Sequence, residues 1–248
     1  MKWNDLSKNN KLYFFIITFI IGFFIRMMDP SSLIMCLYYI LLSFYVYKKD
    51  ERKNALGLQK TTWKAEYLSL LSPLIFIAIF FPFYVLSPLC PIHLFDALLK
   101  MAYDLVGNVF LMIIIFYILI GTFSVFAEEI YFRGFLQDAM DDLLDIRNYD
   151  RPKHFSFKRF LSLLIVSFLF GISHLNLLWA SLFEWFSIPP DFLFIIIGII
   201  SLAGVGLLFG FLRIKFNSLY PAIISHAISN FFMIFIPSMI IWLNGGFS

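Results

Sequence analysis

The stretch RFLSLLIVSFLFGISHLNLLW, residues 159–179, is apolar over most of its length and carries the histidine His174. About 20 apolar residues suffice to cross a bilayer as an α-helix, because lipid offers the backbone no other hydrogen-bond partners. An ionisable side chain in such a run is costly and usually faces a protein interior or a watery cavity. The stretch therefore predicts a membrane-spanning helix that contributes to a functional site.

The composition extends this interpretation to the whole chain. Of the 248 residues, 61% are hydrophobic and 14% are charged, more apolar surface than a soluble domain of this length could bury. We therefore predict an all-α fold, a multi-pass transmembrane bundle of seven or eight helices around a polar intramembrane cavity. Residues 1–248 are expected to form a single integral membrane domain. Seven spans are expected, near 12–28, 32–47, 68–88, 105–127, 160–178, 192–213 and 219–243, with a further short helix in 89–104.

The basic residues alternate between connections. Seventeen of the 19 Lys and Arg residues fall on one side of these spans, and only Arg26 and Lys100 fall on the other. The positive-inside rule then places the N-terminus in the cytoplasm and the C-terminus outside it. The net charge of +3 gives no indication of a nucleic-acid partner.

The first polar cluster is AEEIYFRGFL, residues 127–136. Glu128 and Glu129 point about 100° apart on a helix, so they are expected to have different roles. Arg133 lies four residues after Glu129, the spacing of an ion pair on one helix face. This leaves Glu128 to face the cavity as a general base that activates water. The alternative is a helix end that carries ordinary solvated charges.

Two further clusters carry the histidines. In FGISH, residues 170–174, Phe170 lies one turn before His174 and is expected under the imidazole. In SHAISN, residues 225–230, His226 and Asn230 are four residues apart and project from one helix face. Such side chains can also serve only as hydrogen bonds between packed helices.

Taken in order, EExxxR, FxxxH and HxxxN resemble the CAAX protease and bacteriocin-processing family of intramembrane endopeptidases. The resemblance covers about residues 120–240, the motif-bearing core. It implies a helical bundle with a conical cavity that opens to the cytosol. It also implies that Glu128 activates water, that His174 positions or polarises that water, and that His226 and Asn230 stabilise the oxyanion. The supporting residues would be Glu129, Arg133 and Phe170.

The expected reaction is hydrolysis of a peptide bond in a hydrophobic or lipidated peptide, prenylated or not, within the lipid bilayer. No cofactor is expected. The alternative is a zinc ion held by Glu128, His174 and His226. A further alternative is a non-enzymatic immunity or peptide-binding membrane protein, and a small transporter is the third.

One geometric conflict follows from the predicted spans. If a helix ends at residue 127 and the next begins near residue 160, Glu128 and His174 lie some ~20 Å apart at 1.5 Å per residue. Either the span before Glu128 is misplaced, or residues 155–165 project from the membrane before the helix enters it. The polar sequence HFSFKR favours the second explanation.

Overall fold

The structure is a computed structural model, which describes the chain in seven ranges: 6–28, 33–50, 57–58, 61–86, 103–146, 156–175 and 192–243. Within these ranges every regular element is a helix, so the all-α prediction is confirmed. The helices are α1 (Lys8–Met28), α2 (Leu33–Asp50), α3 (Trp63–Leu86), α5 (Val109–Phe116), α6 (Val125–Glu129), α7 (Gln137–Leu143), α8 (Phe157–Ser173), α10 (Phe192–Phe216) and α11 (Tyr220–Leu243), with π-helical segments η3 (Tyr117–Ser124) and η4 (Ile130–Leu136). Most of the predicted short helix in 89–104 lies outside the described residues.

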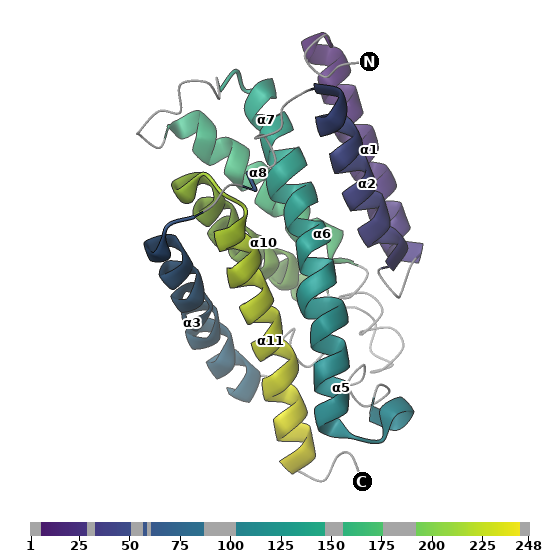
Figure 1. The fold of residues 1–248 in the computed structure, drawn as a ribbon, viewed down its shortest axis with the longest axis vertical. Coiled ribbons are helices and arrows are strands. Elements are labelled where there is room, and N and C mark those ends of the chain that lie inside the picture. Colours follow the sequence, from purple (N-terminus) through teal and green to yellow (C-terminus); the bar gives the residue numbers. More distant parts are fainter. Residues whose placement is uncertain are drawn as a thin grey trace.

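The centre of the bundle is one continuous helical rod, formed by α5, η3, α6, η4 and α7 in succession (Figure 1). The prediction that this span ends at residue 127 is wrong, because the helix continues through Glu128 to Leu143. The fourth helix is thus about 50 Å long at 1.5 Å per residue. Buried apolar residues on α7 keep it packed, although its sequence is polar.

The extended rod resolves the conflict over Glu128 and His174. Glu128 lies 15 residues before Leu143, and His174 lies 17 residues after Phe157, in α8, which packs against α7. Glu128 and His174 therefore lie at similar distances from the end of the bundle where α7 ends and α8 begins. The longer fourth helix brings them together, and the projection of residues 155–165 from the membrane stays a prediction.

The α1–α2 hairpin packs along the upper half of the rod (Figure 1). Gly22 permits this approach, because a Cβ there would lie 2.9 Å from the ring of Tyr39. Tyr39 stacks on Tyr131 of η4 with ring centroids 4.0 Å apart. The hydroxyl of Tyr47 donates to the carbonyl of Gly134 at 2.7 Å. These contacts fix the hairpin on the π-helical segment that follows Glu129.

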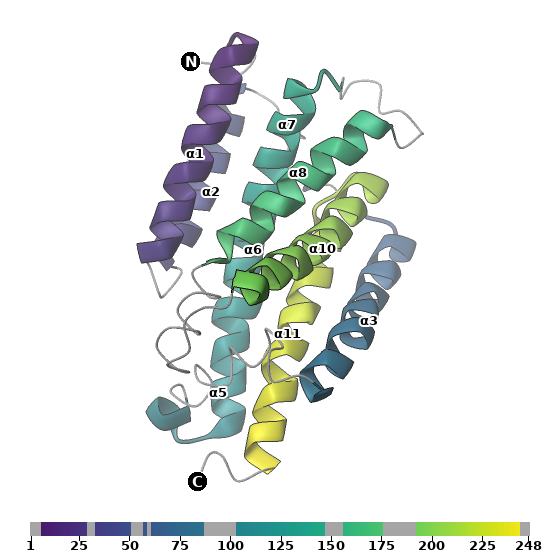
Figure 2. The same cartoon turned by 180° about the vertical axis from the view of Figure 1, so that it is seen from behind.

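Helices α8 and α10 cross the other face of the rod obliquely (Figure 2). Ser156 caps α8, since its hydroxyl accepts from the backbone N–H of Arg159 at 3.2 Å. Gly171 lets α10 approach closely, because a Cβ there would lie 2.5 Å from the backbone oxygen of Ile199. His174 lies three residues after Gly171 and forms the C-cap of α8.

Substitution of Gly171 by Ala is expected to lower stability by about 1–3 kcal/mol, the usual cost of overpacking against a neighbour that cannot yield. The neighbour is backbone of α10 rather than a flexible side chain. Gly204 is the matched control, since a Cβ there would meet nothing within 4 Å. Its replacement by Ala should be neutral or stabilising. Thermal unfolding of both variants in detergent measures the difference, and equal melting temperatures would contradict the prediction.

The chain is an integral membrane protein. Among the residues that the structure describes, three helices are long and apolar enough to cross a bilayer, over Lys8–Met28, Ile195–Phe216 and Tyr220–Leu243, and Leu33–Lys48 is a shorter apolar helix. Large apolar side chains cover the outer face of α1, among them Ile17, which is 54% exposed. Outside a membrane such a surface would be an aggregation hazard.

The two ends of the described chain lie at opposite ends of the bundle, where α1 begins and where α11 finishes (Figure 1). This agrees with the odd number of spans predicted. The charge count behind the predicted orientation includes Arg26 on one side and Arg133 on the other, but both side chains are buried in the bundle and mark neither membrane surface. The location of the N-terminus in the cytoplasm stays a prediction.

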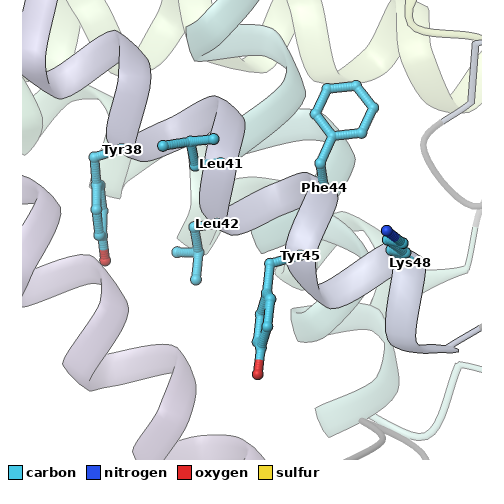
Figure 3. A pocket seen from close by; sticks show the side chains of 6 residues that line it. All are labelled: Tyr38, Leu41, Leu42, Phe44, Tyr45 and Lys48. Carbon is cyan, nitrogen blue, oxygen red and sulfur yellow. The ribbon is translucent and has the colours of Figure 1, made fainter.

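A recess of about 570 Å³ lies along α2. All six residues that line it come from this helix, as Figure 3 shows. The lining is almost wholly apolar, apart from Lys48 at the end of the row. None of the residues predicted for the functional site contributes to it.

Candidate functional site

The two adjacent glutamates lie on α6, the single α-helical turn between two π-helical segments. π-helical turns inside α-helices occur frequently at functional sites. Glu128 is 3% exposed and Glu129 is fully buried, so neither is the solvated helix end of the alternative interpretation. Two buried carboxylates in a bundle need partners for their charge, and the structure provides different partners for each.

Glu129 lies between Arg133 and His226. The Nε atom of Arg133 lies 3.6 Å from Glu129 Oε2, which confirms the ion pair predicted from the four-residue spacing. The other oxygen, Oε1, accepts a hydrogen bond from His226 Nδ1 at 2.9 Å. The guanidinium of Arg133 also donates to the carbonyl of Gly206 at 3.2 Å. Glu129 thus joins the last helix to the rod, a connection that helix spacing could not indicate.

Glu128 faces His174. Its Oε2 atom lies 3.7 Å from His174 Nε2, which is too long for a direct hydrogen bond. The other ring nitrogen, Nδ1, lies 2.7 Å from the carbonyl oxygen of Phe170. Because a carbonyl only accepts, we assign the proton to Nδ1, and the neutral ring then presents a lone pair at Nε2. The ring of Phe170 lies under the imidazole as predicted, with centroids 4.5 Å apart.

Phe170 also joins the two halves of the site. Its ring lies 4.5 Å from the guanidinium carbon of Arg133 and 5.8 Å from the imidazole of His226. On the far side of His226, the ring of Phe209 stacks at 4.5 Å and 20°. Aromatic rings therefore hold both histidines and exclude bulk water around the Glu129–Arg133 pair.

Asn230 lies one turn after His226 on α11, as predicted, and its side chain is partly exposed. Within the described part of the chain it makes no hydrogen bond, whereas His226 is engaged with Glu129 through Nδ1. The two residues therefore present an imidazole Nε2 and an amide for use by a ligand. The polar cavity predicted next to these residues stays a prediction. Residues 176–191 lie outside the described ranges.

Two partners of Glu128 were not predicted. The Nη1 atom of Arg26, near the end of α1, lies 3.1 Å from Glu128 Oε1, with both side chains 4% exposed. The hydroxyl of Ser124 donates to the same oxygen at 3.1 Å. Ser124 precedes Glu128 by four residues, so its helical spacing could have identified it. For Arg26, the only indication in the sequence is its position as a charged residue at the end of an apolar run.

The site thus consists of two groups of the same composition, each with an arginine, a glutamate and a histidine. They are Arg26–Glu128–His174 and Arg133–Glu129–His226, and their glutamates are consecutive residues of α6. Among the described residues, no group of three or more His, Cys, Asp or Glu side chains is arranged to hold a metal ion. A zinc ion bound by Glu128, His174 and His226 would have to use Nε2 of His226, since Nδ1 faces Glu129.

A family model described as type II CAAX prenyl endopeptidase Rce1-like matches residues 110–232. The chain belongs to this family. No curated protein matches the chain, and no solved structure matches it either.

The match to the CAAX prenyl endopeptidases runs from α5 to the middle of α11. It includes Glu128, His174, His226 and Asn230, so the resemblance seen in the three motifs is confirmed at the level of the family. Members of this family are intramembrane hydrolases of peptide bonds. Helices α1, α2 and α3 precede the matched residues, and Arg26 is therefore a part of the site that the family model does not cover.

Proposed function

We propose that the protein is an intramembrane endopeptidase in which Glu128 activates a water molecule for attack on a peptide bond. The observation that carries this proposal is the pair formed by Glu128 Oε2 and His174 Nε2, which face each other at 3.7 Å in a buried, aromatic-lined part of the bundle. Both atoms are acceptors in the assigned protonation state. A water beside this pair can donate one proton to each, which directs its lone pair away from both, towards a substrate carbonyl.

The chemistry then proceeds in two steps. Glu128 takes a proton from the water, the hydroxide forms a bond to the carbonyl carbon, and the carbonyl oxygen becomes an oxyanion. The C–N bond then breaks, and the leaving amine receives the proton from Glu128. Hydrogen bonds from Asn230 and from His226 Nε2 would stabilise the oxyanion, a contribution that is commonly about 10²–10³ in rate.

His226 needs a proton on both ring nitrogens to serve in this way. Its Nδ1–H is donated to Glu129, so a proton on Nε2 makes the ring an imidazolium. The carboxylate of Glu129, at 2.9 Å, accepts from Nδ1–H and fixes the orientation of the ring. The role we propose for Glu129 is therefore to support His226, while Arg133 holds Glu129 in place.

The substrate we propose is a hydrophobic or lipidated peptide that reaches the site within the lipid bilayer. The test is incubation of the purified protein in detergent with a farnesylated CAAX peptide and with the same peptide lacking the lipid. Mass spectrometry would identify the products. Release of the three terminal residues from the farnesylated peptide is expected, and faster cleavage of that peptide would assign a prenylated substrate.

Two further outcomes separate the alternatives. Cleavage that persists after treatment with a strong chelator is expected for the water-activating carboxylate, whereas loss of cleavage that zinc restores would establish the metal-dependent mechanism. Saturable binding of either peptide without any cleavage would contradict the proposal and would support the non-enzymatic peptide-binding alternative.

A further inference from the structure

Arg26 is the one guanidinium of the site that comes from outside the family-matched residues. It lies two residues before the end of α1, is 4% exposed, and contacts Glu128 Oε1 at 3.1 Å. It also lies beside Tyr39 of α2. A cation buried in a membrane protein is costly and usually has a functional role. A basic residue that served only to anchor α1 would lie at the membrane surface instead.

The charges of the site indicate which carboxylate Arg26 serves. Arg133 is engaged with Glu129 and with the carbonyl of Gly206. Arg26 is the guanidinium at Glu128. Each glutamate therefore has its own arginine, and the two pairs come from different parts of the chain.

The contacts also distinguish the two oxygens of Glu128. Arg26 and Ser124 both contact Oε1, at 3.1 Å each, and only Oε2 is directed at His174. The terminal torsion of a glutamate is broad, so an unrestrained carboxylate rotates readily. The ion pair with Arg26 and the hydrogen bond from Ser124 both act on this one oxygen, so they oppose that rotation and keep the other oxygen in front of the imidazole.

The position of Arg26 along the bundle is set by a regular antiparallel register. Ion pairs join Lys8 to Asp145 at 2.8 Å and Lys11 to Asp142 at 3.4 Å, at the other end of α1. From Lys8 to Arg26 the chain advances 18 residues, and from Asp145 back to Glu128 it retreats 17. The two antiparallel helices therefore advance by nearly equal numbers of residues, so Arg26 of α1 lies beside Glu128 of the rod.

We propose that Arg26 is a positioning residue of the endopeptidase site, which holds Glu128 through Oε1 so that Oε2 faces His174 and the attacking water. The α1–α2 hairpin thereby supplies an essential group to a site that otherwise lies wholly in the family-matched residues. This inference rests on the proposed function, since positioning is measured through the cleavage reaction.

The experiment compares Arg26→Gln and Arg26→Lys with wild type, using the monodisperse fraction of each protein and the peptide that wild type cleaves. Arg26→Gln is expected to lower kcat by about 10²-fold, the effect of a misplaced catalytic group, with KM changed by no more than about threefold. Arg26→Lys should fall between the two, because lysine keeps the charge but not the planar fork. Ser124→Ala, which removes the hydrogen bond to Oε1, should also lower kcat more than it raises KM.

Lys64→Gln is the control, because it removes an exposed cation at the start of α3 that takes no part in the contacts of α1 with the rod, and it should leave kcat unchanged. A folded Arg26→Gln protein with the kcat of wild type would overturn the proposal. If Arg26→Gln does not fold, full kcat in Arg26→Lys would also overturn it, since Arg26 would then be only a structural charge. Failure of the proposed function is visible separately, as a wild-type protein that cleaves no peptide.

Discussion

Replacement of Glu128 by Gln is expected to lower kcat for peptide cleavage by roughly 10³-fold or more, near the upper range for loss of a general base. Glutamine has nearly the same shape but cannot take a proton from water. The contacts of Arg26 and Ser124 with Oε1 can be kept in part by the amide oxygen, so the fold should be retained. Steady-state kinetics on the purified protein measure the effect.

The matched control is Glu66→Gln, an identical change at an exposed carboxylate near the start of α3. This variant should cleave like wild type. If Glu128→Gln kept more than about a tenth of the wild-type kcat, Glu128 could not be the base that the proposed mechanism requires.

Replacement of Arg133 by Met is expected to destabilise the protein by about 3–5 kcal/mol, the usual cost of leaving a buried charge without its partner. Arg133 is fully buried among the rings of Phe132, Phe170 and Phe209, and Glu129 lies 3.6 Å away. Once the guanidinium is removed, Glu129 remains in an apolar environment with only His226 beside it. The midpoint of thermal or denaturant unfolding in detergent reports the loss.

The double variant Glu129→Gln with Arg133→Met separates charge from packing. Because it removes both charges, it should recover a large part of the stability lost in the single variant. Lys8→Met breaks an ion pair that is exposed, and its unfolding midpoint should equal that of wild type within error. An Arg133→Met protein as stable as wild type would contradict the assignment of Glu129 and Arg133 as a buried pair.

The parts of the site that depend on local helical spacing could be predicted from the sequence. The Glu129–Arg133 pair and the placement of Phe170 under His174 both follow from a separation of four residues, and both are present. The different partners of Glu128 and Glu129 also follow from helix geometry, because adjacent residues point in different directions. Such predictions hold because side chains three or four residues apart meet on any helix, whatever packs against it.

The length of the fourth helix could not be predicted, because the apolar sequence that marks the span ends near residue 127, whereas the helix continues through polar sequence to Leu143. Asp141 is fully buried there, bonded to the hydroxyl of Ser162 in α8, and Gln137 donates to the same hydroxyl at 2.6 Å. Polar side chains that satisfy one another between two helices let the helix continue. Only the structure reveals that partner.

Arg26 could not be predicted for a different reason. It is separated from Glu128 by 102 positions, and no periodicity relates them. Its role depends on how α1 docks on the rod, through contacts such as that of Gly22 with Tyr39. The hydrogen bond between His226 and Glu129 likewise depends on the packing of α11 against α6.

The depth of Glu128 below the end of the rod limits what the protein can cut. Leu143, the last residue of α7, lies 15 residues beyond Glu128, which is about 22 Å at 1.5 Å per residue. A peptide that enters from that end and runs fully extended covers at most ~3.3–3.6 Å per residue, so it needs about six or seven residues to bring a bond to the carboxylate. A folded protein that approaches the proposed site from that end could therefore be cut only near a chain end or within a tail that is free over at least that length.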